Sequence, residues 1–195
     1  VIDSTPPKTP TPVVNPTSDT GTNTTDGVTT DNTPTISGTG ETGDTITVVT
    51  PKGETISTTV DPSGNWSVTP TTPLADGSEP IKVTETDKAG GTATTVVPVV
   101  IDSTPPKVPG ADVNPTSDTG TNTTDNRTPP NTPPSSSTGQ TADTIPVVTP
   151  KGETISTTVD PSGNRSVTPT TPLADGSEPV KVTDTDKAGR TATAA

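Results

Sequence analysis

Short runs of apolar residues alternate with polar residues along this chain, and turn-forming residues separate the runs. Ile46 and Val48 are two positions apart, and Ile56 and Val60 fall on one side of the next run by the same period. Successive side chains of a β-strand point to opposite faces, so the pattern predicts strands with one buried face. No stretch has the period of an α-helix. Strands are expected at residues 13–14, 33–38, 45–50, 55–60, 66–68, 81–83 and 92–101.

One stretch determines how the chain is organised, because residues 61–77 recur almost letter for letter at residues 160–176. The two copies are 99 residues apart, and about a hundred residues is the size of one small β-sandwich. The sequence therefore predicts two tandem domains. The first is residues 1–102, which open with a Pro-rich linker at 1–12, and the second is residues 103–195.

The fold expected for each domain is an all-β Greek-key sandwich of about seven strands, because a turn signal recurs roughly every 8–12 residues. Trp66 is the chain's only aromatic residue. A lone Trp on a strand of a domain so poor in aromatics is expected at the centre of the core, although an exposed platform for a carbohydrate is the alternative. Leu74 is the one apolar residue of its loop and is expected to close the end of the core.

The second copy departs from the first at positions that matter for strands and core. A strand-interior Pro removes a ladder hydrogen bond, and loss of a buried Trp costs about 3–5 kcal/mol. We expect the second copy to be degenerate and partly disordered. It also ends at Ala195 without a second copy of the run TTVVPVVID at residues 94–102, so we expect a C-terminally truncated repeat and a chain that is one piece of a longer array. The damaging exchanges are Thr35 to Pro134, Ile36 to Ser135, Thr47 to Pro146 and Trp66 to Arg165.

Composition limits the classes of function. The net charge of −12 disfavours a nucleic acid or an anionic membrane as partner and favours divalent cations. No apolar run is long enough to cross a membrane. The chain has no Cys and no His, and it has neither a G-x-S-x-G nor an S-x-x-K spacing, so no enzymatic activity is expected. With 26 Pro and only 22% hydrophobic residues, a Thr/Pro-rich disordered spacer stays open as an alternative.

The runs GNWSVTPTTPLADGS, KVTETDKAGGT and VVIDSTPP together resemble the bacterial Ig-like repeats of large secreted and surface adhesins and of biofilm-associated proteins. The resemblance covers essentially the whole chain, although Arg190 stands for Gly91 and Pro130 for Asp31 in the second copy. It implies an extracellular rod of Ig-like domains on a bacterial surface, in contact with neighbouring repeats. Other parts of the parent protein would reach a host-cell or biofilm surface. It also implies structural Ca²⁺ near the domain junctions.

Acidic residues suggest where calcium would bind, because Ca²⁺ prefers six to eight oxygen ligands from a flexible loop. Within the first repeat, residues 19–26 supply such oxygens, and the alternative is a solvated loop of side-chain-to-backbone turns. At the junction, three carboxylates held together would repel one another unless a cation lay between them. The loop candidates are Asp19, Asp26 and Asp31, and the junction candidates are Asp102, Asp87 and either Asp118 or Asp125.

The function predicted from these features is structural: stalk or spacer repeats of an adhesin, involved in cell adhesion or biofilm formation and stiffened by Ca²⁺. The main alternative is an Ig-like module that itself binds a glycan or a protein. The scarcity of aromatic residues argues against that alternative.

Overall fold

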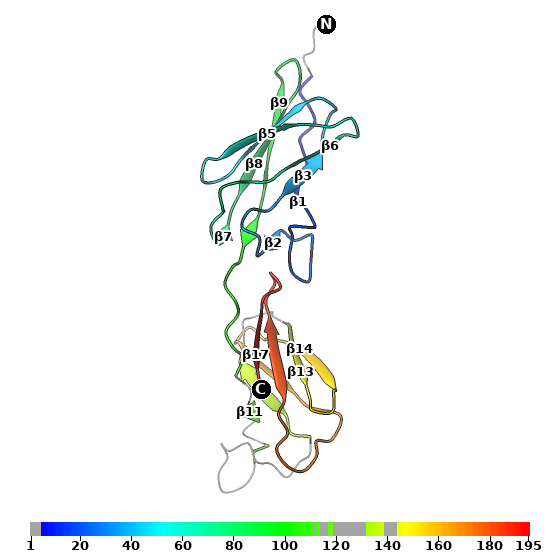
Figure 1. Ribbon diagram of the computed structural model, residues 1–195, viewed down its shortest axis with the longest axis vertical. Coiled ribbons are helices and arrows are strands. Elements are labelled where there is room, and N and C mark those ends of the chain that lie inside the picture. The colour runs from blue at the N-terminus through cyan, green and yellow to red at the C-terminus, as the bar shows by residue number, and fades with distance from the viewer. Residues whose placement is uncertain (1–4, 111, 114–116, 119–131, 139–143) are drawn as a thin grey trace. The chain divides into compact units, whose positions relative to one another are not determined.

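The computed structural model of the chain describes residues 5–110, 112–113, 117–118, 132–138 and 144–195 (Figure 1). Its regular structure consists of strands, and these ranges contain no helix. The chain forms two compact units that divide after Ser103. The prediction of an all-β fold is confirmed.

A four-stranded antiparallel sheet forms one layer of the first unit. Ile46 and Val48 alternate with polar residues along β4, and Ile81 and Val83 do the same along β8, so all four side chains are fully buried. Val48 lies directly opposite Val83 in the ladder. The strand order is β5-β4-β8-β9, with bounds Thr55–Thr59, Thr45–Val49, Ile81–Thr86 and Thr92–Val97.

Two smaller sheets complete the first unit. The antiparallel sheet β1-β3-β6 is made of Val13–Val14, Ile36–Thr39 and Asn65–Val68. The mixed sheet β2-β10-β7 is made of Val28–Thr29, Val100–Ile101 and Gly77–Ser78, with β10 parallel to β2. The single strand expected at 92–101 is in fact two, because the chain leaves the large sheet after Val97, at Pro98, which has no N–H to donate.

The core of the first unit lies between these sheets. Trp66 is 4% exposed and Leu74 is 5% exposed, so both predicted core positions are confirmed. The other buried apolar side chains are Val14, Ile36, Ile46, Val48, Val60, Val68, Ile81, Val83, Val97, Val99 and Ile101.

The second unit repeats the four-stranded sheet and the β1-β3-β6 sheet, and its described residues form a smaller apolar core. Its strands are β11 (Asp112–Val113), β12 (Ser135–Thr138), β13 (Thr144–Val148), β14 (Thr154–Thr158), β15 (Asn164–Val167), β16 (Lys181–Thr185) and β17 (Thr191–Ala194). They form sheets of order β11-β12-β15 and β14-β13-β16-β17. Its buried apolar cluster is Ile145, Val147, Val159, Val167 and Val182.

Pro146 lies inside β13, and its effect on the sheet is local. In the first unit, β4 pairs with β8 at five consecutive residues, Thr45 to Val49. The corresponding pairing of β13 with β16 omits Ile145 and Pro146. The strand survives because its other neighbour, β14, still pairs along the whole length. Pro146 therefore interrupts one ladder, as its missing N–H predicts, without abolishing the strand.

Candidate functional site

The Asp- and Thr-rich loop between β1 and β2 folds back on itself. The buried hydroxyl of Thr29 donates a 2.5 Å hydrogen bond to the Ser18 carbonyl oxygen. The N–H of Thr30 donates to Thr20 Oγ1 at 2.8 Å, and the N–H of Gly27 donates to Asp19 Oδ2 at 3.0 Å. These bonds bring the two ends of the loop together and leave Asp19 only 2% exposed.

Most other acidic and amide side chains of this loop, and Asp31 just after β2, cap their own turns. Asp26 Oδ1 accepts the N–H of Val28 at 3.1 Å, and Asp31 Oδ1 accepts the N–H of Thr33 at 3.0 Å. Asn23 Oδ1 likewise accepts the N–H of Thr25. These are the side-chain-to-backbone turns that the sequence offered as the alternative to calcium ligands.

Asp19 differs because its surroundings make the charged form of its carboxylate unfavourable. Burial raises its pKa, the Gly27 N–H lowers it, and the nearby charge of Asp26 raises it again. Its Oδ1 atom is buried and has no hydrogen-bond partner among the described residues. A cation next to Asp19 and Asp26 would relieve this cost.

Two predicted ligands lie at the same end of the first unit as this loop. The N–H of Asp102 donates to the Thr29 carbonyl at 2.9 Å, and the N–H of Asp31 donates to Thr29 Oγ1 at 3.0 Å. The structure thus brings Asp31 and Asp102 to the two sides of one buried threonine, close to the loop that holds Asp19.

Asp87 lies at the opposite end of the first unit. β8 and β9 run antiparallel from the pair Thr86 and Thr92, next to Asp87, to the pair Ile81 and Val97, from which the chain continues to Asp102. Asp87 caps the turn between them, since its Oδ1 accepts the N–H groups of Ala89 and Gly91 at 2.8 Å each. The first repeat therefore does not bring Asp87 and Asp102 together.

The remaining predicted ligands belong to the second repeat. Asp118 is 2% exposed, and Asp125 lies outside the described residues. Within the described ranges, no three acidic side chains come close enough together to hold a metal ion. The set of calcium ligands stays a prediction.

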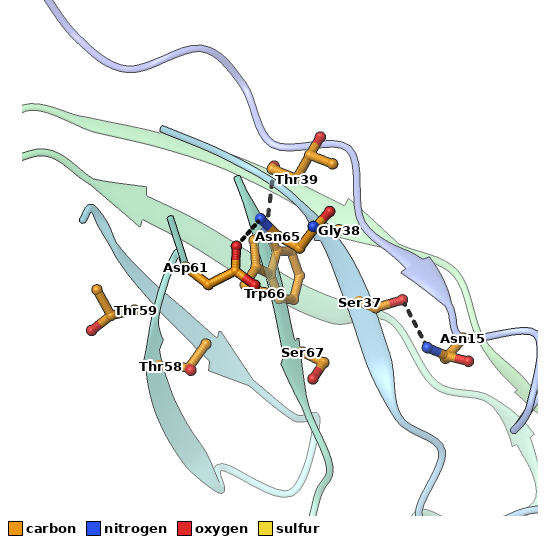
Figure 2. A pocket seen from close by; sticks show the side chains of 10 residues that line it. All are labelled: Asn15, Ser37, Gly38, Thr39, Thr58, Thr59, Asp61, Asn65, Trp66 and Ser67. Carbon is orange, nitrogen blue, oxygen red and sulfur yellow. Dashed lines mark hydrogen bonds between the residues drawn. The ribbon is translucent and has the colours of Figure 1, made fainter. Parts of the chain in front are cut away.

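A polar groove of about 600 Å³ lies on the first unit, at strands β3, β5 and β6 (Figure 2). The Trp66 indole lies beneath it, and its Nε1 donates to the Thr39 carbonyl at 3.3 Å. Gly38 leaves room for the ring, because a Cβ there would lie 2.7 Å from Trp66 Cζ2. The lining residues are Asn15, Ser37, Gly38, Thr39, Thr58, Thr59, Asp61, Asn65, Trp66 and Ser67.

This groove can offer hydrogen bonds to a polar ligand, but its acid is already engaged. Asp61 Oδ1 accepts the N–H groups of Ser63 at 2.8 Å and Asn65 at 2.9 Å, so it holds a turn. Asn15 Nδ2 donates to Ser37 Oγ at 3.4 Å. Sequence reasoning did not identify the groove. The available signal was the run of Ser, Thr and Asn at the alternate positions of β3 and β6.

Glu85 is a buried acid that the sequence reasoning also missed. It is 1% exposed, and its Oε1 accepts the N–H of Glu41 at 2.8 Å. Burial raises its pKa against that hydrogen bond, and the charges of Asp44 and Glu41 raise it further. The signal was its period, because Glu85 follows Ile81 and Val83 on the inward face of β8.

Comparison with known proteins gives one family and several solved structures. The family model described as bacterial Ig-like domain matches residues 5–103 and again residues 105–195. No curated protein matches the chain. No helix in the described ranges has the length and apolar character needed to cross a membrane.

Solved structures similar to this chain include parts of adhesins. A Ca²⁺-stabilised adhesin that helps an Antarctic bacterium reach out and bind ice is 28% identical, covers 98% of this chain and 48% of its own, and has a TM-score of 0.41. A tetra-tandem repeat from the extending region of a large adhesion protein is 22% identical, covers 85% and 45%, and has a TM-score of 0.37. The chain thus spans about half the length of these two structures.

Proposed function

Since the chain belongs to the bacterial Ig-like domain family, which matches it in two tandem copies, we propose that it is a pair of stalk repeats of an adhesin. The adhesin would lie on the bacterial cell surface or be secreted. In this role the repeats space an adhesive part of the parent protein away from the cell. They contact their neighbouring repeats and catalyse no reaction.

The observation that carries this proposal is that the bonds of the framework are duplicated. In the first repeat, Glu54 accepts the N–H groups of Thr71 at 2.9 Å and Thr72 at 3.0 Å, which ties the β4–β5 hairpin to the loop after β6. In the second repeat, Glu153 accepts the corresponding N–H groups at the same two distances. A duplicated set of clamps favours a mechanical role for the repeat.

The start of the linker is also held in place. Ser103 Oγ donates to Asp76 Oδ2 at 2.6 Å, and the Ser103 N–H donates to Asp76 Oδ1 at 3.2 Å. Pro105 and Pro106 follow, and they restrict the backbone further. A tethered, proline-stiffened exit suits a spacer, because it limits bending where one repeat ends.

Calcium would stiffen the same end of the first repeat. Asp19 supplies a buried oxygen without a partner, Asp26 supplies a second carboxylate, and Asp31 and Asp102 lie close by through Thr29. Ca²⁺ takes six to eight oxygens, so the fit within the first repeat is incomplete.

A thermal melt of the full chain, with millimolar Ca²⁺ or with chelator, tests this proposal. Ca²⁺ is expected to raise the melting temperature, and Asp19→Asn and Asp102→Asn are expected to reduce that rise. Asp87→Asn is the matched control, because it changes an acid at the opposite end of the repeat. An equal rise with Mg²⁺, or no rise with Ca²⁺, would contradict the proposed calcium site and leave a spacer without calcium.

The groove over Trp66 favours a second candidate function, the binding of a glycan or another polar ligand. The full chain is screened on a glycan array, and any glycan that binds is then titrated into the chain while its amide NMR signals are recorded. This experiment separates the two functions. A binding module predicts shifts confined to residues such as Ser37, Asn65 and Ser67. A spacer predicts no saturable shift, and saturable binding by the full chain alone would contradict the spacer function.

A further inference from the structure

The second repeat carries two opposite charges where the first carries Trp66 and Glu85. At the spacing of 99 residues, Arg165 takes the place of Trp66 and Asp184 takes the place of Glu85. Both pairs are buried: Arg165 is 6% exposed and Asp184 is 0% exposed, against 4% for Trp66 and 1% for Glu85. The exchange of Trp66 alone predicts a damaged core. The two exchanges together place a cation and an anion in one interior.

The backbone holds both charged residues at equivalent positions in the fold. Arg165 lies on β15 opposite Ser137 of β12, as Trp66 lies on β6 opposite Gly38 of β3. Asp184 lies on β16 at the position that Glu85 has on β8, and it pairs with Ala192 of β17. Both side chains are buried at these positions.

The electrostatics of Arg165 depend on Asp184. Burial lowers the pKa of the guanidinium, and the charge of Asp184 raises it. Arg165 Nε and Nη2 are buried and have no hydrogen-bond partner among the described residues. In the first repeat the two equivalent positions reach the same segment, since Trp66 Nε1 donates to the Thr39 carbonyl and Glu85 Oε1 accepts the N–H of Glu41. A buried charge is costly unless an opposite charge compensates it, so Asp184 offsets part of the cost of burying the guanidinium, although no hydrogen bond joins the two side chains.

We propose that the Arg165–Asp184 pair makes the second repeat an acid-sensitive element of the chain. Protonation of Asp184 leaves the buried guanidinium without its counter-charge, and the second repeat unfolds while the first stays folded. The described core of the first repeat holds Glu85 and no buried base, so it lacks this cause of acid unfolding. This inference does not depend on the spacer function.

Few other charged groups lie on the elements around the pair. Lys181 is exposed at the far end of β16, and Glu153 is engaged with Thr170 and Thr171 at the β13–β14 hairpin. Asp160 and Asp186 cap turns through the N–H groups of Ser162 and Arg190. Asp143, the counterpart of Asp44, lies outside the described residues, so the test includes its variant.

Acid titration of the full chain from about pH 7 to about pH 3, the range in which carboxyl groups titrate, tests the proposal. Amide signals of β13 and β16 report on the second repeat, and Trp66 fluorescence reports on the first. The second repeat is expected to lose its signals while the emission of Trp66 stays that of a buried indole. Loss of both together, or of neither, would overturn the proposal.

Three variants test whether Arg165 and Asp184 cause the acid transition of the second repeat. Arg165→Met removes the buried guanidinium and Asp184→Asn removes the carboxylate charge that opposes it, and we expect each to lower the folding constant of the second repeat about a hundredfold at neutral pH. The double variant is expected within about tenfold of the unmodified chain, and without the acid transition. An acid transition that persists in the double variant would contradict the pair.

The single variant Arg165→Met gives the sharpest discrimination. It removes the guanidinium that opposes the charge of Asp184, so acid should stabilise its second repeat, whereas acid destabilises that of the unmodified chain. Glu85→Gln is the control and should leave the transition of the second repeat unchanged. If Asp143→Asn abolishes the transition, the sensing acid is Asp143 and the assignment to Asp184 is wrong.

Discussion

Trp66 limits which residue can occupy position 38. Gly38 and Trp66 lie opposite each other on β3 and β6, and the indole fills the space that a side chain at Gly38 would need. The sequence alone identified Trp66 as the core centre, because it is the only aromatic residue. It did not identify Gly38, whose φ angle is not in the left-handed region and whose role is steric.

Substitution of Gly38 by Ala should therefore destabilise the first repeat. The added Cβ would lie 2.7 Å from Trp66 Cζ2, so the ring must shift, and overpacking of this kind costs about 1–3 kcal/mol. Urea unfolding followed by Trp66 fluorescence measures the loss. Gly110→Ala is the matched control, because a Cβ there meets nothing within 4 Å. Equal midpoints for the two variants would contradict the steric role.

Glu85 predicts how the first repeat responds to pH. Its pKa is raised, so it contributes stability that is fully present below its unfolded pKa and is lost as the pH rises through the folded pKa. Glu85→Gln should therefore stabilise the first repeat at neutral pH and flatten its stability between acid and neutral pH. Unfolding midpoints measured by Trp66 fluorescence across that range test this. A steeper profile in the variant would show that another group dominates.

At the scale of elements, the strands with a clear period of two were predictable and the shortest ones were not. β4 and β5 lie within the ranges expected from their alternating residues, whereas β6 begins one residue before its expected range and β8 runs three residues beyond its own. β2 and β7 have two residues each, which is too short to show a period, and their pairing depends on the return of β10 along the chain. The burial of Asp19 was likewise not predictable, because it depends on a hydrogen bond with Gly27 across the loop.

Glu54 and Glu153 each join a hairpin to a loop by hydrogen bonds. The stability that these bonds contribute should change with pH in the sense opposite to that of Glu85. Hydrogen bonds from the side chain and backbone of Thr71 and from the N–H of Thr72 lower the pKa of Glu54. Its contribution to stability is present above the unfolded pKa and is lost as the pH falls through the folded pKa. Glu54→Gln should lower the melting temperature of the first repeat at neutral pH, by less than Gly38→Ala. Calorimetry measures this shift, and an unchanged melting temperature would show that the clamp is dispensable.

For the whole molecule, the two repeats should differ in stability. The described part of the second repeat buries five apolar side chains in its cluster, includes Arg165 in its interior and has an interrupted ladder at Pro146. We expect its amide signals to melt before the fluorescence of Trp66 changes. A single cooperative transition in both probes would contradict the prediction that the second repeat is the weaker one.

The pairing of β10 with β2 determines how the first repeat meets a force applied along the chain. The two strands are parallel, and the N–H groups of Val100 and Asp102 donate to the carbonyls of Gly27 and Thr29 at 2.8 and 2.9 Å. Tension on the segment beyond Asp102 acts along β10, so these bonds are loaded in shear and must break together. In the proposed role as a stalk, the first repeat would resist pulling through the simultaneous strength of these bonds, because the strand cannot be peeled away one bond at a time.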